Sequence, residues 1–242
     1  MFLWHHVRMS DVSFPLRINK YLALQGLCTR RAADTLVAEG KVRINGRVAR
    51  VGELVREKDA VTVRAQPRTY RYYAYHKPRG VITHSPQGDE VAIEDAIPAR
   101  GVFPIGRLDK DSYGLIILTD DGRITDALLN PARAHEKEYE VSTRDQLPPG
   151  FKRGMERGVD IGGYRTRPCA VETLGTRKFS ITLTEGKKHQ IRRMCGAFGM
   201  SATELKRVRI MNIRLGSLKA GELRPLRGAE LSIFLESLGV RG

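Results

Sequence analysis

The sequence predicts an α+β protein made of two parts, and three observations lead to this prediction. Two short stretches with helical spacing precede an Asn45-Gly46 hairpin signal within residues 14–65. A polar stretch at 66–71, which contains Pro67, has the composition of a linker. The remaining residues, 72–242, alternate short apolar runs with glycine turns and a few helical stretches. A small module tethered to a larger domain follows from this pattern.

The first part is expected to contain two helices and a small sheet. After a flexible start at 1–13, a helical pattern begins at Arg17 and stops at Gly26. Thr29 is placed to cap a second helix, which ends near Gly40. The Asn45-Gly46 turn then joins two strands, since both residues favour the left-handed conformation that a tight hairpin needs. A last strand is predicted at 60–63.

The second part is expected to contain more strands than helices. A turn is predicted at 76–80 and a flexible loop at 84–89, and Asn130-Pro131 ends one of the helices. The predicted strands are 72–75, 81–83, 115–118, 135–141, 169–171, 179–183 and 205–213, and the predicted helices are 124–129, 151–157, a basic one that begins after Gly186, and 229–238.

The charge of the chain predicts a polyanionic partner. Lys and Arg total 42 against 27 Asp and Glu, which gives a formal net charge of +15 at pH 7. Such an excess suits RNA, and the alternative is charge that serves solubility alone. The three cysteines are far apart, which argues against a zinc site or a disulfide framework and suits the cytoplasm. His5-His6 lacks accompanying ligands, and no signal peptide or membrane-spanning run is seen.

The stretch from Gly106 to Gly122 carries the candidate reactive group. It places Arg107 and Asp109 on a loop between glycines, directly before an apolar run that reads as a buried strand. A carboxylate held beside a cation can act as a nucleophile at a sugar carbon or as a general base. The alternative is an ordinary ion pair on a loop. Residue chemistry alone leaves these two interpretations open.

This stretch resembles the catalytic motif of pseudouridine synthases, and more narrowly that of the RsuA/RluB/RluE/RluF group. The resemblance rests on Gly-Arg-Leu-Asp, Ser112-x-Gly-Leu and Leu-Thr-x-Asp-Gly, with Ser112 where the family usually has Thr. It implies that Asp109 is the catalytic residue. It also implies a catalytic domain with a mixed, mostly antiparallel sheet flanked by helices.

Two further motifs resemble this family. In the Lys-x-Tyr motif, Tyr139 would pack on the target base, although a core tyrosine is the alternative. In the family's Glu-Gly-x-x-x-Gln-Ile-Arg-Arg-Met motif, a basic residue pairs with the catalytic Asp. We assign this role to Arg192, with Arg193 and Lys187 as alternatives. The other interpretation is that these basic residues form a solvated helix face. The residues expected to contact RNA in this part are Arg107, Lys77, Lys187, His189, Gln190 and Arg193.

The first part resembles the S4 RNA-binding domain over roughly residues 15–65, with Val-x-Ile-Asn-Gly as its most characteristic feature. An idle cap domain is the alternative, but a helix opened by two arginines already favours phosphate. The residues expected to bind RNA here are Arg17, Lys20, Arg30, Arg31, Lys41, Arg43 and Asn45.

The resemblance implies conversion of a uridine in folded 23S rRNA to pseudouridine, because sequence motifs such as Arg-x-Arg-Ile-Met-Asn are similar to those of the RluF branch. A tRNA anticodon uridine is a second candidate substrate, and 16S rRNA is the alternative within the enzyme class. A non-catalytic S4-type ribosome-assembly factor is the alternative outside it. No cofactor or metal is expected, since the product is an isomer, and the protein is expected to be a monomer.

Overall fold

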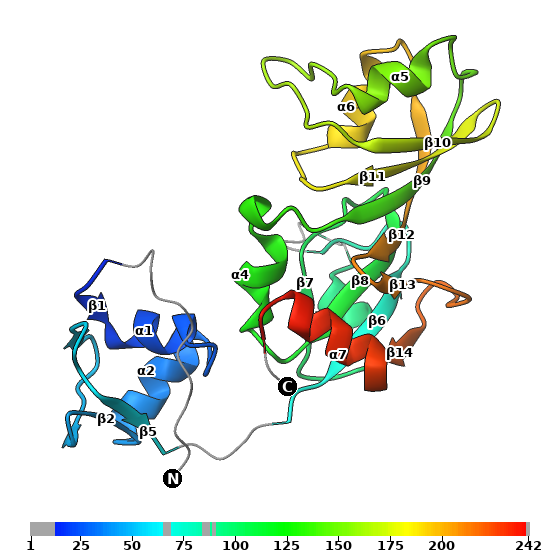
Figure 1. Ribbon diagram of the computed structural model, residues 1–242. Coiled ribbons are helices and arrows are strands. Elements are labelled where there is room, and N and C mark those ends of the chain that lie inside the picture. Colours follow the sequence, from blue (N-terminus) through cyan, green and yellow to red (C-terminus); the bar gives the residue numbers. More distant parts are fainter. Residues whose placement is uncertain (1–12, 65–68, 84–87, 89–90, 241–242) are drawn as a thin grey trace. The chain divides into compact units, whose positions relative to one another are not determined.

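The computed structural model describes residues 13–64, 69–83, 88 and 91–240. Most of the predicted flexible start, including His5-His6, lies outside these residues, as do the first half of the predicted linker at 66–71 and nearly all of the predicted loop at 84–89. The chain divides into two compact units (Figure 1). The first contains the described residues up to Tyr70 with Asp121–Ile124 and Val240; the second contains Arg71–Asp120 and Thr125–Gly239.

The first unit contains the two predicted helices and the predicted hairpin. Thr29 caps the second helix, because its hydroxyl oxygen accepts a hydrogen bond from the backbone N–H of Ala32 at 3.1 Å. Asn45 and Gly46 have φ angles of 50° and 80°, as a tight hairpin turn requires. Its elements are β1 (Leu16–Arg17), α1 (Ile18–Leu24), α2 (Arg30–Ala38), β2 (Val42–Ile44), β3 (Arg47–Val48), β4 (Leu54–Val55) and β5 (Val61–Val63).

The second unit is built on one large mixed sheet with the strand order β10-β11-β9-β12-β8-β6-β14, to which β7 and β13 add at β8 and β12. Only β12 and β8 pair in parallel among its described strands. Its strands are β6 (Tyr72–Lys77), β7 (Phe103–Ile105), β8 (Tyr113–Thr119), β9 (Lys137–Thr143), β10 (Ala170–Gly175), β11 (Lys178–Leu183), β12 (Ala202–Ile210), β13 (Ile213–Arg214) and β14 (Leu223–Pro225). Its helices are α3 (Ile93–Ala96), α4 (Ile124–Leu129), the 3₁₀ helix η1 (Pro131–Arg133), α5 (Phe151–Glu156), α6 (Gln190–Gly196) and α7 (Gly228–Ser237).

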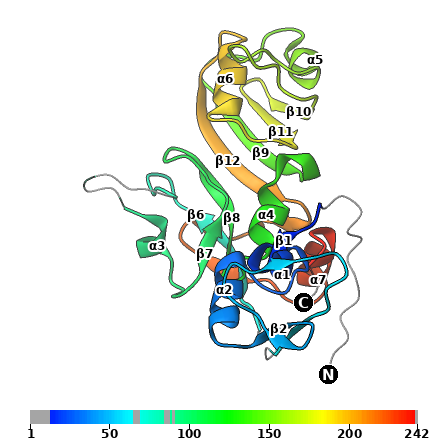
Figure 2. The ribbon, with the colours of Figure 1, turned by 90° about the vertical axis from the view of Figure 1, so that its left-hand side faces the viewer.

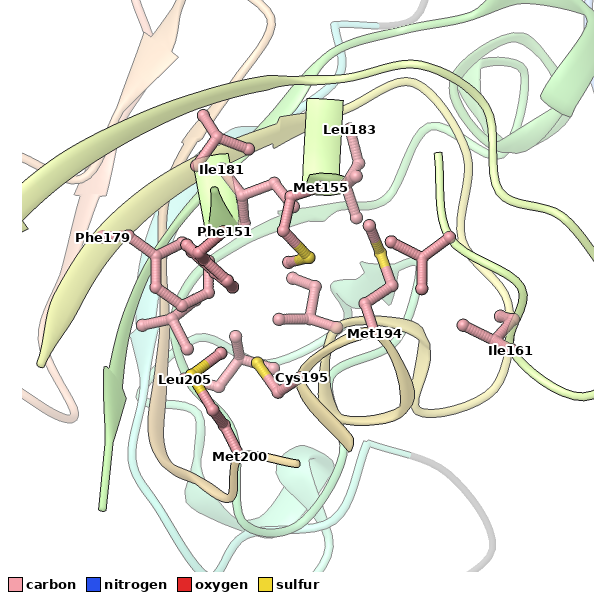
Figure 3. Packing of buried hydrophobic residues seen from close by; sticks show 14 residues of the cluster. Phe151, Met155, Ile161, Phe179, Ile181, Leu183, Met194, Cys195, Met200 and Leu205 are labelled. Atoms are coloured by element: carbon pink, nitrogen blue, oxygen red, sulfur yellow. The ribbon is translucent and has the colours of Figure 1, made fainter. Parts of the chain in front are cut away.

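Apolar packing on both faces fixes the middle of this sheet. In β8, Leu115 to Leu118 are all fully buried, which explains the continuous apolar run in the sequence. Helices α5 and α6 lie together on one face of the sheet at β9–β12 (Figure 2). Met155 of α5 and Met194 of α6 pack there against Phe179 and Leu205 of the strands (Figure 3). This core anchors α6, whose N-terminal end lies at the candidate site.

Three local predictions need correction. The strand predicted at 205–213 is divided into β12 and β13, which pair antiparallel around a tight turn where Met211 has a φ of 51°. The predicted turn at 76–80 begins later, because His76 and Lys77 continue β6 and pair with Leu115 and Gly114 of β8. Pro78 then ends the strand, since it has no N–H to donate. The predicted strand at 81–83 is reduced to a single bridge between Ile82 and Ala92. As a result, Lys77 lies inside the sheet and not in an exposed turn.

Candidate active site

A row of four register partners crosses the centre of the sheet. Tyr139 of β9 pairs with Arg207 of β12, Arg207 pairs with Gly114 of β8, and Gly114 pairs with Lys77 of β6. Gly114 is the second residue of β8, which directly follows the loop that carries Asp109. The sheet therefore brings Tyr139 and the Asp109 loop to neighbouring positions, although they are distant in the sequence.

Glycine is required where β8 meets β12. Gly114 has a φ of +104°, and a Cβ atom added there would lie 2.3 Å from the carbonyl oxygen of Arg207. Only a residue without a side chain permits this close approach of two backbones. Gly114, the second glycine of the motif, is thus needed for the close packing of β8 against β12.

Hydrogen bonds from two side chains, Thr83 and Arg207, fix the Asp109 loop. The Thr83 hydroxyl donates to the carbonyl oxygen of Leu108 at 2.7 Å and accepts from the Leu108 N–H at 3.1 Å. Arg207 Nη1 donates to the carbonyl oxygen of Arg107 at 3.3 Å, and its Nε donates to that of Leu115 at 2.7 Å. The Asp109 side chain is 41% exposed. A carboxylate on a fixed loop is thus open to an incoming ligand.

The N-terminal end of α6 lies next to Asp109. Nε2 of His189 is 3.7 Å from Oδ1 of Asp109, and His189 itself has a left-handed backbone with a φ of 51°. Arg192, one turn further along, donates from Nη1 to the carbonyl oxygen of Ala202 at 2.8 Å. Its Nη2 is buried and has no hydrogen-bond partner among the described residues. The structure does not form the predicted pair between Arg192 and Asp109, so that pair stays a prediction.

Lys77 is fully buried, which corrects the expectation that it contacts RNA. Its ammonium donates to the carbonyl oxygens of Pro78 and Val81 at 2.9 and 2.7 Å. Burial, and secondarily the charge of Arg207, lower the pKa of Lys77 to about 8, while Asp109 raises it. Lys77 therefore binds the backbone that follows β6 and does not face solvent.

Gln190 is also buried, at 4% exposure, and this removes it from the residues available to RNA. Its side chain donates to Glu185 at 2.8 Å and accepts from the N–H of Lys187 at 2.9 Å. The Lys187 ammonium lies 4.4 Å from the centre of the Tyr164 ring. Arg107, Lys187, His189 and Arg193 are exposed.

The predicted RNA-binding side chains of the first unit are all exposed, but some have internal partners. Lys41 pairs with Glu39 at 2.7 Å, and Arg43 donates to the carbonyl oxygen of Gly46 at 2.7 Å. The Asn45 amide donates to Asp59 and accepts from the N–H of Ala60, each at 2.8 Å, so it braces its own loop. Among the described residues of the first unit, the members of this set that form no hydrogen bond or ion pair with an acidic side chain are Arg17, Lys20, Arg30, Arg31 and Arg43.

Comparisons with known proteins agree with this geometry. Residues 71–197 match the family model described as RNA pseudouridylate synthase, and residues 16–61 match the S4 domain. The chain is 41% identical to the dual-specificity RNA pseudouridine synthase RluF of Escherichia coli K12, over 89% of this chain and 77% of that protein. The chain belongs to the RNA pseudouridine synthase family. The synthase is also 33% identical to ribosomal large subunit pseudouridine synthase B of Bacillus subtilis, over 89% of this chain and 93% of that protein.

A solved structure extends the similarity to the fold. The crystal structure of a pseudouridylate synthase superposes with a TM-score of 0.66 and 27% identity, covering 92% of this chain and 99% of the other. The synthase thus combines an S4 domain with a catalytic domain on a mixed sheet, and its substrate is RNA. Among the helices that the structure describes, none combines the length and the apolar composition that a transmembrane span requires.

Sequence reasoning missed the two residues that fix the Asp109 loop, Thr83 and, above all, Arg207. Arg207 is 3% exposed, yet it fixes both ends of the Asp109 loop, and its Nη2 has no hydrogen-bond partner among the described residues. The signal was present in the Leu-x-Arg sequence pattern that begins at Leu205, but a strand arginine in a basic chain resembles many others.

Among the described residues of the synthase, no group of three or more His, Cys, Asp or Glu side chains is arranged to hold a metal ion.

Proposed function

We propose that this synthase isomerises a uridine of 23S rRNA to pseudouridine, with Asp109 as the catalytic carboxylate. The observation that supports this most directly is the setting of Asp109, which is half-exposed on a loop fixed by Thr83 and Arg207 and lies next to His189. A base within an RNA helix must leave its stack to reach such a group. The open side of Asp109 is where the extruded nucleoside would enter.

The reaction breaks the bond between N1 of uracil and C1′ of the ribose and forms a bond between C5 and C1′. Asp109 would attack C1′ or take a proton from the sugar; both fit a positioned carboxylate. The proton on C5 is lost after the new bond forms, and N1 gains one. Atoms and electrons balance within the nucleotide, so the isomerisation requires no redox partner.

Four side chains have proposed roles around this reaction. Tyr139, which is half-buried and packs against the core under α6, would provide a flat face for the extruded base. Arg107 would hold RNA at the loop, and His189 would contact the nucleotide beside Asp109. The free Nη2 of Arg192 supports its role as the cation that pairs with Asp109 once RNA is bound.

The relatives support the choice of RNA. Sequence motifs similar to the RluF branch, together with the 41% identity to a dual-specificity synthase, favour 23S rRNA near the peptidyl-transferase centre as the substrate. A tRNA anticodon uridine is the second proposed substrate. We further propose an S4 domain at 14–65, a linker at 66–71, a catalytic domain at 72–242, and action as a monomer in the cytoplasm. A 16S rRNA substrate is the alternative.

Mapping of pseudouridines tests the substrate. Ribosomal and transfer RNAs from cells with and without the gene are compared at nucleotide resolution. The proposal predicts loss of one 23S position, restored by the wild-type protein. A lost position confined to 16S rRNA would refute the 23S assignment, and no lost position would favour a non-catalytic RNA-binding role.

Deletion of residues 1–65 tests the division of labour. The Kd for substrate RNA should rise by at least tenfold, whereas the rate of the chemical step at saturating RNA should change by less than threefold. An unchanged Kd would show that the S4 domain does not supply the binding energy.

A further inference from the structure

A buried carboxylate ties together three segments beside the site. Glu185, at 5% exposure, accepts hydrogen bonds from the Tyr164 hydroxyl at 2.5 Å, from the Arg167 N–H at 2.9 Å and from Nε2 of Gln190 at 2.8 Å. Burial by itself raises the pKa of Glu185, but these hydrogen bonds together lower it. The carboxylate is therefore an ionised hub between the 164–167 loop, the turn after β11 and α6.

The network continues into the turn that presents His189. Gln190, the first residue of α6, donates to Glu185 and accepts from the N–H of Lys187, so its side chain closes the turn from inside. His189 lies within this closed turn, and its left-handed backbone is a conformation that non-glycine residues adopt only when surrounding contacts hold it. A second contact reinforces the turn, because the Lys187 ammonium packs on the Tyr164 ring.

The same hub sets the start of α6. His189 points Nε2 toward Asp109 at 3.7 Å, and Arg192 follows one turn later with a free buried Nη2. The core side of the helix is fixed by Met194 and Cys195 (Figure 3). Ile191 is the first residue of α6 in this core, so the residues just before it are not held by apolar packing and need hydrogen bonds to fix them. The network around Glu185 supplies these hydrogen bonds.

We infer that Glu185 is a positioning residue for the isomerisation, acting through Gln190 and Tyr164 to hold the first turn of α6, and with it His189 beside Asp109 and the side chain of Arg192. The inference rests on the proposed role of Asp109. Glu185 itself does not touch the reacting nucleoside. Its removal should lower the rate of the chemical step more than the affinity for RNA, because the exposed residues that bind phosphate remain.

An exchange of hydrogen-bonding groups tests the inference on the full chain. Gln190→Glu places two carboxylates face to face, whereas Glu185→Gln combined with Gln190→Glu restores a donor and an acceptor between the same positions. The exchange removes the oxygen that the Arg167 N–H also uses, so the network is restored in part. Single-turnover rates on a 23S rRNA fragment should fall at least tenfold in Gln190→Glu and recover at least threefold from that value in the double variant. The RNA concentration at half-saturation should stay within twofold throughout. Glu172→Gln, at an exposed position of β10, makes the same charge change as Glu185→Gln and should leave the rate unchanged.

Tyr164→Phe keeps the inference falsifiable if Gln190→Glu does not fold. It removes only the hydroxyl that donates to Glu185 and keeps the ring beneath Lys187. We expect a three- to tenfold lower single-turnover rate in a protein that remains folded at the assay temperature. Wild-type rates in every folded variant would overturn the inference, as would a loss seen only in RNA affinity. If Asp109→Asn remains active, the proposed function fails instead; if Asp109→Asn is inactive while these variants keep wild-type rates, only the positioning role fails.

Discussion

Replacing Gly114 with Ala should damage the sheet at the point where the site is assembled. The added Cβ would lie 2.3 Å from the carbonyl oxygen and 2.8 Å from the nitrogen of Arg207. Both atoms belong to the backbone of β12, so no side chain can rotate away to make room. Strand β12 must move, and with it the guanidinium that holds the Asp109 loop.

Two costs add in this variant. A left-handed backbone costs a residue with a Cβ roughly 1–2 kcal/mol. Overpacking of a close contact typically adds about 1–3 kcal/mol. The free energy of unfolding should therefore fall by roughly 2–5 kcal/mol. Gly175→Ala is the matched control, since Gly175 has an ordinary φ and nothing within 4 Å of an added Cβ; its effect should stay within about 1 kcal/mol.

Urea unfolding of the full chain measures the two variants side by side, and single-turnover assays measure their rates. Gly114→Ala should lose stability and, in the folded protein, at least tenfold in rate. A loss below about 1 kcal/mol, equal to that of Gly175→Ala, would refute the claim that backbone contact requires glycine at this position.

Two further predictions follow from buried and exposed cations. The pKa of Lys77 is lowered from 10.5 to about 8, so between these pH values the unfolded chain binds more protons than the folded one. As the pH increases through this range, the free energy of unfolding of the wild type should therefore rise relative to that of Lys77→Met, by roughly 3 kcal/mol in total. Urea unfolding at pH 7.5 and 10.5 checks this, and a pH-independent difference would contradict it. Combined Arg30→Gln and Arg31→Gln should reduce the slope of log K for RNA against log salt by about 1–2. An unchanged slope in filter-binding titrations would show that these exposed arginines do not contact phosphates.

Local chemistry made much of the fold predictable. The Thr29 cap and the Asn45-Gly46 turn depend on neighbours within three residues, and both form as predicted. The apolar run of β8 identified a buried strand for the same reason. The dense motif around Asp109 identified the family, and with it the order of the two domains.

Contacts between distant segments set the limit of this reasoning. The hydrogen bond between Arg207 and Leu115 joins residues 92 positions apart, and the Leu-x-Arg pattern around Arg207 does not reveal this partner. Lys77 looked like a turn residue because Pro78 follows it, but pairing with Gly114 buried it. Gln190 seemed available to RNA until the fold brought Glu185 against it. In each case a tertiary partner, absent from the local pattern, determined whether the side chain faces solvent.

The most direct test of the central claim is the single-turnover rate of Asp109→Asn on substrate RNA. The substitution keeps the shape of the side chain and removes only its charge, and Asp111→Asn on the same loop is the matched control. We expect no pseudouridine from Asp109→Asn at saturating RNA, with a Kd for RNA within threefold of the wild type and a normal rate for Asp111→Asn. Pseudouridine formation by Asp109→Asn at the wild-type rate would contradict the assignment of the carboxylate as the reacting group.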